Sequence, residues 1–205
     1  VKLPPGHSLT VRRGAAVPSP REYWDVTFTA SSILSPKEAS AELVERLQES
    51  VRLRMISEVP LGAFLSGGVD SSAVVAMMAE VSAAPVNTCS ISFSDAKYDE
   101  SQYAQQVAQR YRTRHHVERV ESDDFDLIDL LARLYDEPYA DSSAIPTYRV
   151  CQLARKHVTV ALSGDGGDES FGGYRRYRLH MMEERLRQPL QSLPIDTAAL
   201  PAGHA

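Results

Sequence analysis

The segment Phe64–Ser72, FLSGGVDSS, combines two adjacent glycines with three serines and one carboxylate, that of Asp70. Glycines let a backbone approach an oxyanion closely, and serines add hydroxyl donors. The residues that would form such a cradle are Ser66, Gly67, Gly68, Ser71 and Ser72. The lysine of a G-x-x-x-x-G-K-[ST] phosphate loop is missing. Asp70 would repel phosphate unless a cation lay between them, so the segment predicts a pyrophosphate cradle that works with Mg²⁺. A tight turn with Asp70 as a helix N-cap is the alternative.

A second glycine-rich segment, SGDGGDESFGGY at residues 163–174, has three carboxylates within five residues, Asp165, Asp168 and Glu169. Like charges this close repel one another unless a cation or solvent relieves them. We therefore expect Asp168 to be a second magnesium ligand opposite Asp70, with Ser163 and Gly164 lining a nucleotide. A solvated acidic turn is the alternative.

Both segments follow predicted strands. Four short apolar runs predict strands at Val59–Leu65, Val86–Phe93, His115–Val120 and Val158–Leu162, and helical patterns separate them. The helices are expected at about residues 36–57, 70–81, 101–111, 122–138, 146–157 and 174–187. This alternation predicts an α/β fold, an open parallel doubly wound sheet with helices on both faces. The carboxyl ends of parallel strands share one edge, so the two glycine segments should face one cleft.

Composition narrows the class of protein. The chain has 205 residues and a net charge of −5, which argues against nucleic acid as a general partner. It has no apolar run long enough to span a membrane, so a membrane is not an expected partner either. Two cysteines, Cys89 and Cys151, argue against a disulfide scaffold, and both are expected to be buried thiols. These features are typical of a cytoplasmic protein.

Three parts of the chain are expected. Residues 1–30 alternate like short strands around a Pro/Ala linker and predict the tail of a preceding β-rich domain. Residues 31–190 contain the predicted sheet, and residues 191–205 predict a frayed tail.

Five segments together resemble a known family. LSGGVDSS is similar to the pyrophosphatase loop of the ATP-pyrophosphatase (PP-loop) superfamily, whose fold is adenine nucleotide alpha hydrolase-like. The others are YDES (Tyr98–Ser101), RHHVERV (114–120), DEPYADSSAIPTY (Asp136–Tyr148) and LSGDGGDESFGGYRRY (Leu162–Tyr177). With them the chain resembles the synthetase domain of glutamine-hydrolysing asparagine synthetases over about residues 55–180. LPPGHSLTVRRG, near the start, resembles the end of that family's glutaminase domain.

The resemblance implies a reaction and roles for residues. ATP would adenylate the side-chain carboxylate of aspartate, pyrophosphate would leave, and ammonia derived from glutamine would displace AMP. Asp70 and Asp168 match the magnesium carboxylates, and Asp165 matches an acidic residue near the reacting centre. The remaining matches bind the nucleotide: Leu65 and Ile91 at the adenosine, Ser66, Gly67, Gly68, Ser71 and Ser72 at the pyrophosphate, and Ser163 and Gly164 as a further contact.

The resemblance also leaves alternatives open. The family's N-terminal catalytic cysteine and its later catalytic lysine have no counterpart here, so we expect a fragment that is inactive alone and works beside a glutaminase domain. β-Lactam synthetases and lasso-peptide cyclases share the domain, so another carboxylate, for instance in surface-polysaccharide amidation, is the alternative substrate. A degenerate nucleotide-binding module is the third interpretation. The sequence leaves the oligomeric state open, and a homodimer is one alternative.

Overall fold

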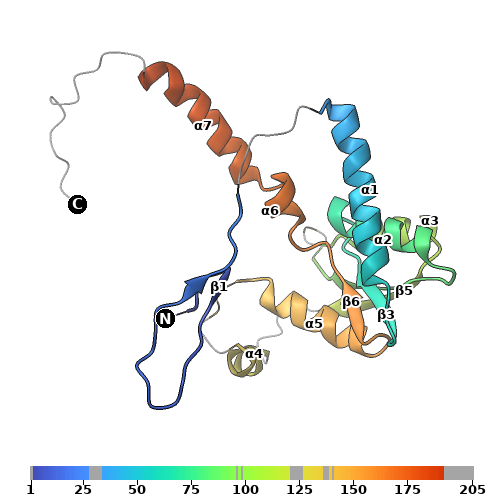
Figure 1. The fold of residues 1–205 in the computed structure, drawn as a ribbon. Helices are drawn as coiled ribbons and strands as arrows, with labels where there is room; N and C mark the ends of the chain where they lie inside the picture. The colour runs from blue at the N-terminus through green and yellow to red at the C-terminus, as the bar shows by residue number, and fades with distance from the viewer. Residues whose placement is uncertain are drawn as a thin grey trace. The chain divides into compact units, whose positions relative to one another are not determined.

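We describe a computed structural model of the chain (Figure 1). It describes residues 2–27, 34–95, 97, 99–120, 127–135, 139 and 141–191, with side chains as far as residue 187. The chain divides into two compact units, Val1–Glu42 and Leu43–Ala205, which we describe separately. The predicted tail lies outside the described residues except for Gln191, and the boundaries predicted at residues 30 and 190 stay predictions.

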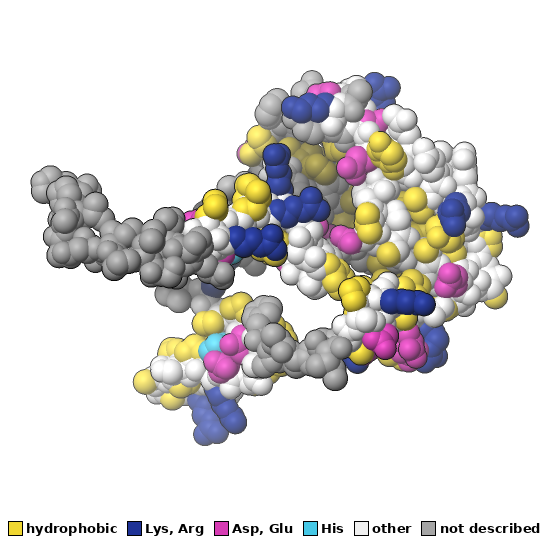
Figure 2. Space-filling model, turned by 90° about the horizontal axis from the view of Figure 1, so that it is seen from above, with side chains coloured by type: hydrophobic (Ala, Val, Ile, Leu, Met, Phe, Trp, Pro, Cys, Tyr) yellow, Lys and Arg dark blue, Asp and Glu magenta, His cyan; other side chains and the backbone are white. Residues whose placement is uncertain are grey.

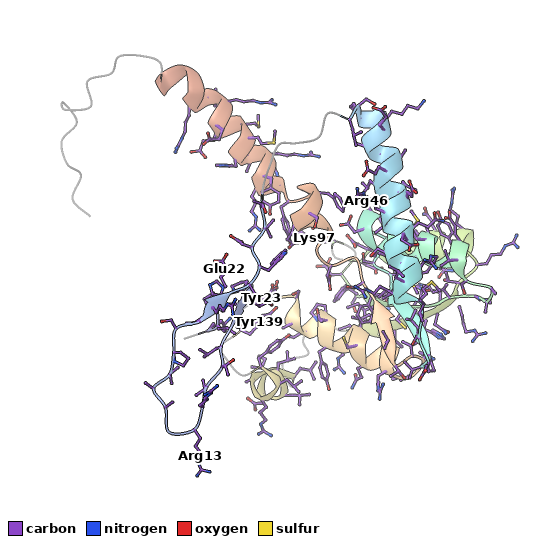
Figure 3. The ribbon with its side chains drawn as sticks, in the orientation of Figure 1. Arg13, Glu22, Tyr23, Arg46, Lys97 and Tyr139 are labelled. Carbon is purple, nitrogen blue, oxygen red and sulfur yellow. The ribbon has the colours of Figure 1, made fainter. Side chains whose placement is uncertain are left out.

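The first unit contains a short antiparallel pair, β1 (His7–Ser8) and β2 (Arg21–Glu22). His7 pairs with Glu22, and the loop between the strands carries Arg13 outward near its tip (Figure 3). Helix α1 (Pro36–Arg54) begins here and runs into the second unit. A capping box lies at its start, because the Ser35 amide donates to Glu38 Oε2 (2.9 Å) and the Glu38 amide donates to Ser35 Oγ (3.3 Å).

The second unit is built on a four-stranded sheet in the order β5-β4-β3-β6. Its strands are β3 (Leu61–Phe64), β4 (Asn87–Phe93), β5 (Arg114–Val120) and β6 (Val160–Leu162), and every pairing is parallel. The helices are α2 (Val69–Val81), α3 (Ser101–Arg110), α4 (Ile128–Leu134), α5 (Ala144–Arg155), α6 (Gly167–Phe171) and α7 (Arg175–Gln191). The predicted parallel α/β fold is therefore confirmed.

Helices cover both faces of this sheet. Ala63 and Leu65 point to one face, where they pack with residues of α1, α2 and α3 such as Val51, Val75 and Ala104. Phe64, between them in sequence, points to the other face and packs with α5. A smaller cluster joins α4 to α5. The core thus holds β3, and the loop that follows it, from two sides.

Some local predictions are wrong. Asp70 is not the N-cap of α2; Gly68 occupies that position, and no side chain caps the helix. Cys89 is buried as expected, but Cys151 is exposed because α5 turns it away from the sheet. The short helix α6 was not predicted, because five residues carry too little periodicity to detect. Parts of the predicted helix at residues 122–138, namely 122–126 and 136–138, lie outside the described residues.

Candidate functional site

The two glycine-rich loops leave neighbouring strands at the same edge of the sheet. β3 pairs with β6, with Ala63 opposite Leu162, and each loop begins directly after its strand. A Cβ added at Gly164 would lie 2.6 Å from the Ser71 amide nitrogen, so only a glycine lets the second loop approach the start of α2 this closely. The expected convergence of the loops is therefore present.

A cleft of about 880 Å³ lies between these loops. Asp70 lines it from the first turn of α2, and Asp168 lines it from α6. A Cβ at Gly167, next to Asp168, would lie 2.5 Å from Asp70 Oδ2. The predicted site residues that line this cleft are Ser66, Gly68, Asp70, Ser71, Ser163, Gly164, Asp165 and Asp168.

A smaller, more apolar pocket of about 240 Å³ adjoins the cleft. Leu65 and Ile91, the two residues expected at the adenosine, both line it. The buried Cys89 also lines it, and burial raises the pKa of its thiol to about 11. The pocket and the cleft share four lining residues, Phe64, Ser66, Thr147 and Val150. One end of the combined hollow is therefore apolar and the other is acidic.

Hydroxyl hydrogen bonds fix the first loop. Ser66 Oγ and Ser71 Oγ lie 2.9 Å apart, and the Gly68 amide donates to Ser66 Oγ (3.2 Å). Gly67 has φ +87°, and a Cβ there would lie 2.5 Å from the Ala104 amide nitrogen of α3. Gly67 and Ser72 are not among the residues lining either hollow, and the buried Oγ of Ser72 has no hydrogen-bond partner in the described part of the chain.

Two carboxylates of the second loop are held by hydroxyl groups. Ser163 Oγ donates to Asp165 Oδ2 (3.1 Å), and the Tyr174 hydroxyl donates to Glu169. The bond to Glu169 raises the pKa of Tyr174 to about 12 and lowers the pKa of Glu169. Arg176 stacks on the Tyr174 ring, 4.6 Å from its centroid. Sequence reasoning missed Tyr174, although its place at the end of a glycine-rich segment was a signal.

The carboxylates around the cleft fit a nucleotide that is held through magnesium. Among the described residues that line the cleft are four carboxylates and no lysine or arginine, so a polyphosphate needs an intervening cation. Nor do the described residues contain a group of three or more His, Cys, Asp or Glu side chains able to hold a metal by themselves. Mg²⁺ suits this setting, because it commonly takes one or two carboxylates and completes its shell with phosphate oxygens and water.

The surface adds two observations. On the face seen in Figure 2, lysine and arginine side chains are scattered among carboxylates and apolar groups. Within the described residues, no helix combines the length and apolar composition needed to span a membrane.

Comparisons with known proteins place the chain in a family. The asparagine synthase family model matches residues 42–202. A putative glutamine-hydrolysing asparagine synthetase 2 of Methanocaldococcus jannaschii is 47% identical over 154 residues, which cover 74% of this chain and 30% of that protein. Glutamine-hydrolysing asparagine synthetase 1 of Bacillus subtilis is 32% identical over 194 residues, covering 94% of this chain and 30% of that protein.

Other matches are more distant. A Gibberella zeae protein named amidase chry2 is 28% identical over 211 residues, covering 89% of this chain and 30% of that protein. An NH3-dependent NAD synthetase structure from Campylobacter jejuni aligns with a TM-score of 0.46 and 12% identity over 65% of this chain and 60% of that chain. The chain spans 30% of the length of each curated relative named here. The family match covers well over half of the chain, and the chain therefore belongs to the asparagine synthase family.

Proposed function

We propose that the protein carrying this chain synthesises asparagine from aspartate, ATP and ammonia. The observation that carries the proposal is that Asp70 and Asp168, far apart in sequence, line one cleft that adjoins an apolar pocket. An oxygen of the aspartate side-chain carboxylate attacks the α-phosphorus of ATP, and the bond to the bridging oxygen breaks to release pyrophosphate. Ammonia then attacks the acyl carbon, and AMP leaves with the electron pair of the broken acyl–oxygen bond.

Each part of the site has a task in this reaction. Leu65 and Ile91 provide apolar contacts for the adenosine, while Ser66, Gly68 and Ser71 face the β- and γ-phosphates. Asp70 and Asp168 hold Mg²⁺, which when bound neutralises charge that develops on the departing pyrophosphate. Asp165, beside the cleft and bonded to Ser163, orients or deprotonates a group at the reacting centre.

The rest of the proposal follows the names of the relatives. Because several are named glutamine-hydrolysing, we propose that a glutaminase domain of the same protein supplies the ammonia, and that the protein works in the cytoplasm. A second candidate is amide formation on a different carboxylate. The match to a protein named amidase, rather than asparagine synthetase, favours keeping it.

An ATP–pyrophosphate exchange assay on the whole protein tests the proposal. Exchange should depend on aspartate, and complete turnover should yield AMP and asparagine in equal amounts. Asp70→Asn and Asp168→Asn should each lower exchange by about 100-fold or more, the upper end of the effect known for residues that only support a metal ligand. Asp129→Asn, on the exposed side of α4, is the matched control and should retain exchange.

Three results would contradict parts of the proposal. ADP as a product would exclude adenylation. Exchange that requires another carboxylate and ignores aspartate would establish the second candidate. A protein that binds no nucleotide in the presence of Mg²⁺ would be a degenerate module.

A further inference from the structure

The glycines of residues 163–174 fall into two kinds. Gly166 and Gly172 have φ of +90° and +66°, where only glycine is relaxed, and a Cβ on them would meet open space or Tyr177 Cδ2 at 3.9 Å. Gly164, Gly167 and Gly173 do not have positive φ, but a Cβ on any of them would collide with a neighbour. The first kind forms turns, and the second kind permits close approach.

The groups that approach Gly167 and Gly173 are the two carboxylates of the proposed metal site. A Cβ on Gly167 would lie 2.5 Å from Asp70 Oδ2 and 2.9 Å from Oδ1. A Cβ on Gly173 would collide with Asp168 Oδ1 and lie 2.9 Å from Asp168 Cγ. Real Cβ atoms essentially never come this close to another atom, so each carboxylate occupies the space that a methyl group would need.

Hydrogen bonding separates these two carboxylates from the other two that line the cleft. Asp165 accepts from Ser163, and Glu169 accepts from Tyr174. Within the described part of the chain, no hydrogen bond to the carboxylate of Asp70 or Asp168 is present. Their oxygens keep their lone pairs available, and the space that each carboxylate occupies is open because the neighbouring glycine has no Cβ.

We propose that Gly167 and Gly173 are positioning residues for the metal site. By lacking a Cβ they let the carboxylates of Asp70 and Asp168 lie where both can reach one divalent cation. This inference rests on the proposed function for the identity of the metal site, but it does not depend on which carboxylate the protein amidates. An added methyl group should turn one carboxylate away and weaken the cation without removing any ligand.

Manganese binding to the whole protein tests this directly. Mn²⁺ is titrated by electron paramagnetic resonance with an ATP analogue that carries a methylene bridge between the α- and β-phosphorus atoms. Gly173→Ala should weaken Mn²⁺ binding by about 10- to 100-fold, the range seen when a metal ligand loses its orienting partner. Gly167→Ala should act alike through Asp70, and it keeps the test open if the first variant does not fold.

Gly172→Ala is the matched control. It adds the same methyl group one residue away and strains a positive φ, so it should lower the melting temperature, but its Cβ meets no carboxylate. Its Mn²⁺ affinity should equal that of the wild type. In an Asp168→Asn background, Gly173→Ala should change Mn²⁺ affinity by less than about threefold, because the two substitutions affect the same ligand.

The outcomes separate the two proposals. If folded Gly173→Ala and Gly167→Ala proteins bind Mn²⁺ as tightly as Gly172→Ala, the positioning role is wrong even if the enzyme makes asparagine. If the variants lose Mn²⁺ while the wild type shows no exchange with aspartate, the positioning role stands and the proposed substrate is wrong. A wild type that binds no Mn²⁺ with the analogue would overturn both.

Discussion

The adjacent histidines of β5 have separate environments, because neighbouring side chains of a strand point to opposite faces. His115 Nδ1 lies 2.9 Å from Thr88 Oγ1, and its Nε2 is buried without a partner in the described part of the chain. His116 stacks on His157, with ring centroids 3.5 Å apart. Burial lowers the pKa of both histidines, and the charges of His157 and Arg114 further lower that of His116.

These lowered pKa values predict a loss of stability in mild acid. The unfolded chain binds protons at the ordinary histidine pKa of 6.5, whereas the folded chain resists them, so the free energy of unfolding should decrease as the pH falls through 6.5 toward the folded values. Thermal unfolding from about pH 7.5 to about pH 5.5 measures the slope. His116→Gln should flatten it, whereas His180→Gln, on the exposed surface of α7, should not. Equal slopes for the two variants would contradict the assignment.

At the scale of elements, α2 matters because its first turn carries Asp70 and Ser71. Its position depends on Val75 and Met78, whose side chains are fully buried against β3 and α3. Val74 and Met77 are partly buried and pack against the same cluster, so apolar contacts to the core hold α2 in place.

Shortening Met78 should therefore destabilise the fold. Met78→Ala should lower the free energy of unfolding by about 2–5 kcal/mol, through lost burial and the cavity left behind. Urea denaturation measures this, with Met182→Ala on the exposed surface of α7 as the control, expected within about 0.5 kcal/mol of the wild type. If Met78→Ala lowers the free energy of unfolding as little as the control does, the packing of Met78 in the core does not hold α2 in place.

The order of the elements could be predicted from sequence because apolar runs and helical periodicity are local signals. The edge at which the loops meet followed from the parallel topology. Details set by tertiary contacts could not be predicted. The helical register that Tyr103 shares with Val107 and Tyr111 predicts a buried Tyr103. Its side chain is instead 60% exposed, because the small Ala104 and Ala108 face the core. The contacts of Gly167 and Gly173 with carboxylates likewise join residues whose spacing in sequence does not indicate them.

At the scale of the whole molecule, charge decides how a nucleotide can bind. The chain carries a net charge of −5, and the described lining of the cleft adds no cationic side chain to offset its four carboxylates. The adjoining pocket, in contrast, is mostly apolar and does not need a cation to accept a base. Phosphate binding and base binding should therefore respond differently to metal.

Removing the metal should abolish phosphate binding and leave base binding unchanged. ATP binding, measured by calorimetry, should be lost when EDTA replaces Mg²⁺, because the triphosphate then meets unscreened carboxylates. Adenosine, which has no phosphate, should bind with the same affinity in both conditions. ATP that binds equally well in EDTA would show that the acidic end of the cleft does not hold the phosphates.

The pairing of β6 with β3 has a consequence for biosynthesis. The paired residues Leu61 and Val160 are roughly a hundred positions apart, so among the described strands of this sheet the first in sequence pairs with the last. On the ribosome, Asp70 emerges long before Asp168, and a nascent chain that still lacks Asp168 cannot hold the proposed metal with both carboxylates. ATP held through the proposed metal can thus stabilise only chains in which β6 has joined β3, and it should act on a late step of folding and leave the first ones unaffected.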